Sequence, residues 1–392
     1  MAKALINHKI IQWAMDRANV DANFLSNKSK VKLQKIGDWV SGKDFPTMKQ
    51  AQRIANILHV PLGYLFLNDV PEEDIAIPDL RTVGSDPKHK LDPNFRDLLK
   101  DIIFKRSWYR DFIEDIIGEP LPFVGKFTLS SDVRSISNDM REVIFSKQVI
   151  PISSNADDYL RNLISAAENA GVWVIRNGIV GNDTHRPLSV KQLRGFAISD
   201  PFVPLVFING KDAKAAQIFT MAHELAHIWL GQSGISNVDL GEHTFESYKE
   251  IEQKCNAIAA EFLVPQDEFL ISWEKNRNFS ENLNYLYRKF KVSRVVVARR
   301  AYDFGFINKD EYQNYYESEL REWKKFSDRE GGGDFYRNLP LKNGVRFTEY
   351  VVREAVSGRL LFRQAAELLN TQPTTLVKFH QKRLGKDAVL IG

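Results

Sequence analysis

Apolar residues recur at helical intervals through most of the chain, which predicts a mainly helical protein. The pattern first covers residues 4–66, where it begins with Leu5 and Ile10, and glycine- and proline-containing breaks divide it into short helices. Further helical patterns cover residues 95–117, 155–169 and most of 266–325.

The middle of the chain combines strands with two strongly periodic helices. Three short apolar runs predict β-strands at 172–175, 195–198 and 205–208. The first periodic helix is expected at 212–230, with Gly231 as its stop, and the second at 247–263, before Pro265. The predicted fold class is therefore α+β, mainly α with a small β-sheet.

Two stretches predict boundaries between folded parts. Residues 68–94 are polar and contain four prolines, which is typical of a linker. The run Gly331-Gly332-Gly333 is flexible and predicts a second boundary. Because 392 residues exceed the usual size of one compact core, roughly two to four domains are expected.

Composition narrows the class of protein further. The single cysteine, Cys255, excludes a disulfide framework and a zinc finger with four cysteine ligands. No apolar run approaches the ~18–20 residues of a membrane helix, and charges interrupt the N-terminal segment too often for a secretory signal. We therefore expect a cytoplasmic protein with no membrane partner.

Charge is distributed unevenly, although the formal net charge is only +4. Residues 1–67 contain 10 Lys and Arg against 4 Asp and Glu, and residues 341–392 contain 9 against 4. The residues between them, 68–340, contain 35 basic against 42 acidic side chains. Two basic ends indicate nucleic-acid contact there, although a solvated basic surface is the more common cause of such a pattern.

The strongest chemical signal is the run His223-Glu224-Leu225-Ala226-His227 in the first periodic helix. Residues four apart lie on one face of a helix, so both imidazoles can bind the same metal ion. Neutral imidazole is a good zinc ligand, and Glu224 is placed to take a proton from water whose pKa the metal lowers. We therefore expect His223 and His227 to bind Zn2+ and Glu224 to act as general base.

A catalytic zinc needs a third protein ligand and an open fourth position. Glu252, in the second periodic helix, is the leading candidate, because that helix can return beside the first. Glu250, Glu261 and His243 are the alternatives, and Tyr248 and His243 are candidates for stabilising an oxyanion.

Two neighbours of Glu252 are candidates for supporting roles. Asn256 is four residues further along, on the same helical face, and its amide oxygen can accept the distal N–H of a ligand histidine. Cys255 is either a small buried core residue, which is the common role of a free cysteine, or a thiolate that caps the zinc.

The two motifs together resemble the ImmA/IrrE family of zinc peptidases. The family pattern is His-Glu-x-x-His followed by Glu-x-x-Ala-Asn-x-Phe-Ala-Ala-x-Leu-Leu-x-Pro, and this chain has Cys255 and Ile258 where the family has Ala and Phe. The resemblance covers residues 150–272 and implies that His223, His227 and Glu252 bind zinc, with Glu224 as general base. It also implies cleavage of a DNA-binding repressor.

Residues 10–66 resemble a degenerate Cro/C1-type helix-turn-helix domain. The matching parts run from Ile36 to Gly42 and from Pro46 to Phe66, whereas Phe24–Ser29 replaces the usual Ala-x-x-x-Gly turn. In such a motif the second helix lies in the DNA major groove. The expected DNA contacts are the lysines before Trp39, namely Lys28, Lys30, Lys32 and Lys35. A small helical domain for protein contacts is the alternative.

The C-terminal residues 363–376 also have the pattern of a helix, a polar turn and a helix, with basic residues beyond them. A second nucleic-acid contact, a helical lid and a partner-docking segment all remain open for this part.

We expect five segments: a helix-turn-helix domain at 1–67, a linker and helical segment at 68–149, a zinc peptidase domain at 150–272, a helical extension at 273–330 and a basic helical unit at 331–392. The order of the first three, with Ile77–Val83 between them, resembles longer ImmA/IrrE members, which are often regulatory partners of a toxin.

The expected function is that of a zinc-dependent endopeptidase fused to a DNA-binding domain. It would regulate transcription, or a toxin-antitoxin or phage-related circuit, by cleaving or binding a partner protein. The alternative is a DNA-binding antitoxin or repressor with a structural or sensory zinc site and no proteolysis. Expected partners are DNA, a protein substrate or toxin, and a second copy of the chain.

Overall fold

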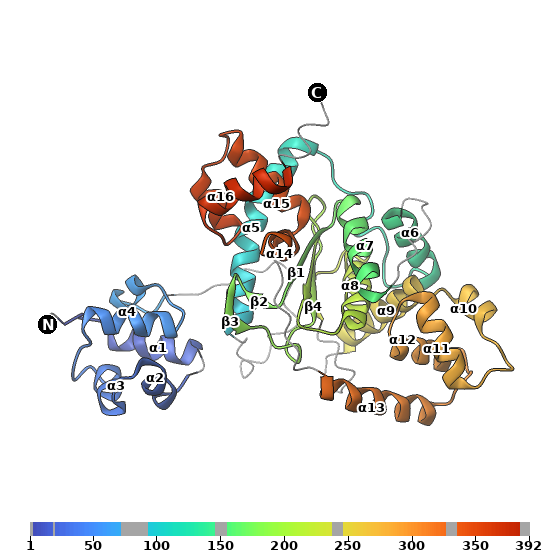
Figure 1. The fold of residues 1–392 in the computed structure, drawn as a ribbon, viewed down its shortest axis with the longest axis horizontal. Coiled ribbons are helices and arrows are strands. Elements are labelled where there is room, and N and C mark those ends of the chain that lie inside the picture. Colours follow the sequence, from blue (N-terminus) through green and yellow to red (C-terminus); the bar gives the residue numbers. More distant parts are fainter. Residues whose placement is uncertain are drawn as a thin grey trace. The chain divides into compact units, whose positions relative to one another are not determined.

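The computed structural model describes residues 3–18, 20–71, 93–145, 155–236, 246–326 and 335–384. Most of the predicted linker and Gly331-Gly332-Gly333 lie outside the described residues. The chain divides into two compact units, and among the described residues the division falls between Lys100 and Asp101, within helix α5 (Pro93–Ile117). The described residues are mainly helical with a small β-sheet, which confirms the predicted fold class (Figure 1).

Short helices form the body of the first unit: α1 (His8–Ala18), α2 (Ala22–Ser29), α3 (Leu33–Val40), α4 (Met48–Ile57) and the 3-10 helix η1 (Leu62–Phe66). Their apolar faces meet in one core that includes Ile10, Ile36, Trp39 and Ile54. Leu5 precedes α1, and it is not part of this core because its surface is 71% exposed. The helical pattern therefore begins later than predicted.

The turn between α2 and α3 also lies later in the sequence than predicted. The side chain of Asp21 accepts the Phe24 N–H and caps α2, so Phe24–Ser29 is helical rather than a turn. Leu25 and Ser29 face the core, which stabilises this otherwise polar segment as a helix. The turn instead begins at Lys30, which adopts the left-handed conformation with φ 59°.

The second unit contains a four-stranded sheet in the order β1-β5-β4-β6. Its strands are β1 (Trp173–Asn177), β5 (Leu205–Asn209), β4 (Gly195–Ile198) and β6 (Gly234–Ser236). The β1–β5 pair is parallel, and the other neighbours are antiparallel. The three predicted strands correspond to β1, β4 and β5, whereas β6 was not predicted.

A separate hairpin joins β2 (Ile179–Val180) to β3 (Asp183–Pro187). It was not predicted, because β2 has two residues and β3 is exposed at every position except Arg186. Neither strand therefore carries the apolar run or the alternation that identifies a strand in a sequence.

Helices pack on the sheet and around one another. Helix α8 (Lys214–Trp229) lies against β4 and β5, and α6 (Val133–Phe145), α7 (Ala156–Asn169) and α9 (Glu246–Leu263) pack against α8 (Figure 1). The first of these, α6, was not predicted. None of the described helices combines the length and the apolar character needed to cross a bilayer.

The remaining helices follow α9 along the chain. They are α10 (Gln266–Ser272), α11 (Phe279–Phe290), α12 (Arg294–Asp303), α13 (Lys309–Phe326), α14 (Phe335–Asn343), α15 (Val345–Val356), α16 (Phe362–Leu368), α17 (Pro373–Phe379) and the π-helical turn η2 (His380–Leu384). Helices α14 and α15 pack against β1, where the Trp173 indole N–H donates to the Asn343 carbonyl at 2.7 Å.

Candidate metal centre

Helix α8 carries two histidines into the interior of the second unit. Almost every residue from Gln217 to Trp229 is buried, because the sheet covers one side of the helix and other helices cover the rest. His223 and His227 are four residues apart, so their rings lie on the same face, with their centroids 5.0 Å apart. Helix α9 packs along that face.

Glu252 of α9 completes a group of three possible metal ligands. Its Oε2 lies 3.1 Å from Nε2 of His223, and its Oε1 lies 3.2 Å from Nε2 of His227. The two Nε2 atoms are themselves 3.2 Å apart. One ligand atom from each of the three residues lies within 4.8 Å of the other two, so all three can face a single cation.

Asn256, one turn after Glu252, fixes the orientation of His223. Its Oδ1 lies 3.0 Å from Nδ1 of His223. Because an amide oxygen only accepts hydrogen bonds, Nδ1 carries the proton and Nε2 presents a lone pair to the other ligand atoms. This is the arrangement that a metal-binding histidine requires.

The electrostatics of the group favour a cation. Burial raises the pKa of Glu252, but the contacts of its carboxylate with the imidazoles of His223 and His227 outweigh that effect and hold the pKa well below its usual range. Burial lowers the pKa of His227 and so favours the neutral, metal-binding imidazole. Two neutral imidazoles and one carboxylate are the donor set of a His2Glu zinc site, so the residues fit this metal.

Glu224 lies next to His223 in α8 and is fully buried. A Cβ placed on Gly195 of β4 would lie 3.0 Å from Oε1 of Glu224 and 2.9 Å from the Phe207 carbonyl oxygen, and would also collide with Thr220. Only glycine therefore lets the strand approach α8 this closely. Gly195 thus shapes the surroundings of Glu224, a role that its place in the predicted strand gave no reason to expect.

The other candidates from the sequence have different surroundings. Cys255 is buried in the main hydrophobic core and burial raises the pKa of its thiol, so it matches the core alternative. Glu250 is exposed, and Glu261 pairs with Arg300. His243 and the side chain of Tyr248 lie outside the described residues.

The four lysines expected to contact DNA are exposed in the first unit. Lys28 ends α2 with Ser29, Lys30 and Lys32 flank the turn, and Lys35 lies in the first turns of α3. They therefore surround the start of α3.

Part of the chain matches a known family. Residues 167–302 match the Peptidase M78 family model, described as the IrrE N-terminal-like domain. The matched segment contains His223, Glu224, His227 and Glu252, and indicates a metallopeptidase-like domain. It also includes α11 and α12, which were expected to belong to a helical extension.

A second family model matches nearer the C-terminus. Residues 343–382 match a domain of unknown function (DUF8813). This segment covers α15, α16, α17 and the first residues of η2. No curated protein matches the chain.

Proposed function

We propose that the chain is a zinc-dependent endopeptidase whose metal is held by His223, His227 and Glu252. The observation that carries this proposal is the convergence of three metal-binding atoms from two helices beside a buried glutamate. Among the described residues, three protein ligands face the proposed metal position, which is the number typical of catalytic rather than structural zinc sites. When bound, zinc would polarise a peptide carbonyl and lower the pKa of water.

Asn256 and Glu224 have separate roles in the proposed reaction. Asn256 holds the proton of His223 on Nδ1 and keeps Nε2 available for the metal. Glu224 takes the proton from the attacking water and delivers it to the leaving amine. The sheet and helices that bury α8 exclude bulk water and keep Glu224 in place.

The variant Glu224→Gln tests this mechanism. It keeps the shape of the side chain and leaves all three metal ligands intact, so zinc content by elemental analysis should be unchanged. Cleavage of a peptide library, followed by mass spectrometry, should fall to background. Glu250→Gln, an exposed position two residues before Glu252 on α9, is the matched control and should cleave like the parent chain. Persistent cleavage by Glu224→Gln contradicts the proposal.

We also propose that the first unit is a Cro/C1-type helix-turn-helix domain that binds DNA, so that the peptidase acts in a regulatory circuit. The support is the pair α2 and α3, joined by a short turn, with Lys28, Lys30, Lys32 and Lys35 exposed around it. A repressor-like or toxin-like protein is the proposed substrate or partner, and a homodimer is the proposed form on DNA.

Fluorescence anisotropy with duplex DNA tests the proposal that the first unit binds DNA. The double variant Lys32→Ala/Lys35→Ala should weaken binding and reduce its salt dependence, because it removes two cationic contacts. Lys9→Ala, an exposed lysine on α1, is the control. Equal losses in the two variants would show that α3 does not form the contact surface.

A further inference from the structure

Three helix pairs in the chain share the same turn. In α2–α3, α11–α12 and α16–α17, a residue in the left-handed conformation precedes the second helix by three positions. These residues are Lys30 (φ 59°), Lys291 (φ 57°) and Asn370 (φ 50°). Positive φ is uncommon outside glycine, and the fourth such residue in the described chain, His59, likewise lies three positions before a helical turn, η1. The three pairs therefore have matching turns.

Burial on the second helix also follows a common register. Six positions after the left-handed residue, Ile36, Val297 and Leu376 are all buried. Nine positions after it, Trp39 of α3 and Phe379 of α17 are buried as well. Each second helix therefore turns equivalent positions towards its own core, and the opposite face is the one available to a ligand.

The opposite face is covered in α12 but open in α17. Seven positions after the left-handed residue, Ala298 of α12 is fully buried, whereas Gly37 of α3 and Val377 of α17 are exposed. The arginines of α12 are engaged within the fold, since Arg300 pairs with Glu261 and Arg299 with Asp303. Around α17, exposed polar and basic residues occur in the helix itself (Thr374 and Lys378), at its N-cap (Gln372) and in η2 (Gln381 and Lys382).

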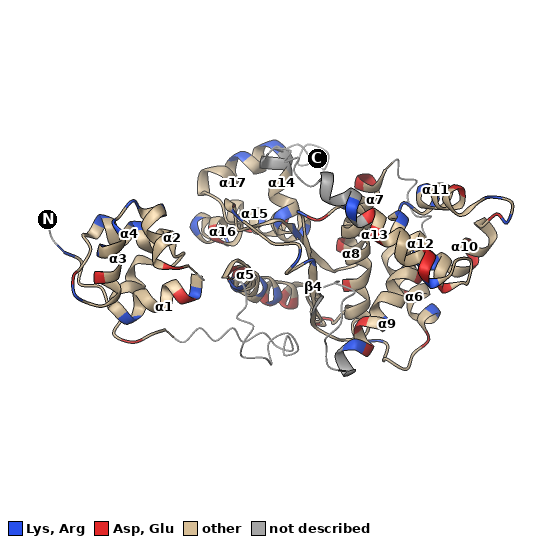
Figure 2. Cartoon of the chain, turned by 90° about the horizontal axis from the view of Figure 1, so that it is seen from below, with Lys and Arg blue, Asp and Glu red and all other residues tan. Residues whose placement is uncertain are grey.

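This face of α17 has the charge of a polyanion-binding surface. No acidic residue occurs between Glu367 and Asp387, and the helix and η2 carry Lys378 and Lys382 among their described residues (Figure 2). Arg363, exposed at the start of α16, adds a further cation to the same pair. Threonine and glutamine beside them can hydrogen-bond to base edges.

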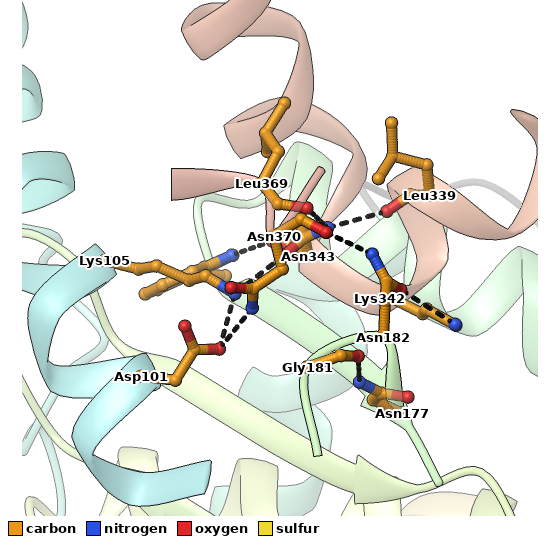
Figure 3. A network of polar contacts seen from close by, with 11 residues as sticks. Asp101, Lys105, Asn177, Gly181, Asn182, Leu339, Lys342, Asn343, Leu369 and Asn370 are labelled. Carbon is orange, nitrogen blue, oxygen red and sulfur yellow. Dashed lines mark hydrogen bonds and ion pairs between the residues drawn. The ribbon is translucent and has the colours of Figure 1, made fainter. Parts of the chain in front are cut away.

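The turn of this pair is fixed to the rest of the second unit (Figure 3). The side-chain amide of Asn370 donates to Asp101 at 2.9 Å, and the backbone carbonyl of Asn370 accepts from the side-chain amide of Asn182. Lys105, which is almost fully buried, donates to the same Asp101 at 2.6 Å. The α16–α17 pair is therefore held in place by its turn.

We propose that α16–α17 is a second DNA-binding helix pair, in which α17 enters the major groove of duplex DNA. The chemistry that recognises the ligand is the acid-free segment around α17, with Thr374 and Lys378 in the helix and glutamines flanking it. The pair is attached to the unit that carries the metal centre, so bound DNA would lie on the catalytic unit itself. This proposal uses none of the residues proposed to act in cleavage or in the first unit.

The test uses the full chain with the substitutions Lys32→Ala/Lys35→Ala, which remove the proposed contacts of the first unit. Binding to a fluorescent random-sequence duplex should persist at low salt in this background. Adding Lys378→Glu should weaken it by roughly tenfold or more, because it reverses one charge on the face of α17. Lys275→Glu is the matched control, since this exposed lysine follows α10, far from α16 in both views (Figures 1 and 2).

Three outcomes would contradict the proposal. Equal losses for Lys378→Glu and Lys275→Glu would show only a general charge effect. Loss of all binding in the Lys32→Ala/Lys35→Ala background would show that only the first unit binds DNA, and would contradict the proposed role of α17. Equal competition by single-stranded RNA of the same sequence would contradict groove recognition. An unchanged thermal unfolding midpoint in Lys378→Glu confirms that the fold is intact.

Discussion

Two groups of buried polar residues in the second unit differ in how their atoms are arranged. Around Asn343 each described contact joins a donor to an acceptor: Lys105 donates to its Oδ1, its own amide donates to the Leu339 carbonyl, and its carbonyl accepts from Trp173 (Figure 3). In the metal centre, by contrast, two imidazole nitrogens and a carboxylate face one point. The first arrangement stabilises a fold, whereas the second has the donor set of a metal site.

The largest expected effect comes from removing one of the converging ligands. Glu252→Gln replaces the carboxylate that contacts both histidines, so zinc measured by elemental analysis should fall from stoichiometric to near zero, and peptide cleavage should disappear with it. Chelation of the parent chain should abolish cleavage, and added zinc should restore it. If Glu252→Gln retains stoichiometric zinc, Glu252 is not the third ligand and another residue fills that position.

A steric change beside the polar network around Asn343 should lower the stability of the fold without changing metal binding. Gly344 has φ +89°, and a Cβ there would lie 2.5 Å from Nε1 of Trp173. Gly344→Ala should therefore lower the free energy of unfolding by about 3 kcal/mol or more, measured by urea denaturation. Zinc content should stay stoichiometric.

Gly358→Ala separates the steric effect from the backbone effect. Gly358 also has positive φ, at +79°, but a Cβ there would meet no atom within 4 Å. Its cost should be only the conformational one, about 1–2 kcal/mol. If the two variants lose equal stability, the clash of the added Cβ with Trp173 contributes nothing beyond the conformational cost at Gly344.

Glu168, which contacts the first residue of α15, should make the stability of this region depend on pH. Burial raises the pKa of Glu168 to about 7, even though its carboxylate accepts the Val345 N–H at 2.8 Å. The folded chain therefore binds this proton more tightly than the unfolded chain, whose ordinary value is 4.5. The contribution of Glu168 to the free energy of unfolding is greatest below about 4.5 and decreases by about 3 kcal/mol as the pH rises to about 7.

Urea denaturation across this pH range measures the effect. Glu168→Gln keeps an acceptor for the Val345 N–H and removes the titration, so the difference in unfolding free energy between parent and variant should change with pH in that window. Glu367→Gln, at an exposed position of α16, should leave the pH profile of the parent unchanged. A parallel pair of profiles for parent and Glu168→Gln would show that Glu168 does not titrate there.

The same contrast explains what the sequence could predict. His223, His227 and Glu252 follow from helical spacing in two neighbouring helices, and the structure brings them together as expected. Asn370 bonds to Asp101, which is far away in the chain, and no local pattern encodes such a contact. The turn after α2 was misplaced because its polar residues resemble a loop, while burial of Leu25 and Ser29 decides for a helix.

Gly195 and the α11–α12 pair were also not foreseen. The role of Gly195 depends on how closely β4 approaches α8, which is a tertiary distance. The shared turn of the three helix pairs appears only as a backbone conformation at Lys30, Lys291 and Asn370, residues of two different types. Local patterns therefore predicted elements and the metal ligands, and tertiary contacts determined the rest.

The smallest expected effect is at Cys255, which packs in the apolar core and is not one of the converging metal ligands. Its side chain packs in the apolar core three residues after Glu252, so Cys255→Ala should cost about 1 kcal/mol of stability through a small cavity. Zinc content and the rate of peptide cleavage should be unchanged, because the thiol is not among the converging ligand atoms. Loss of zinc in this variant would instead favour a closed, structural site in a DNA-binding repressor or antitoxin. Faster cleavage with zinc retained would favour a thiolate that caps the metal.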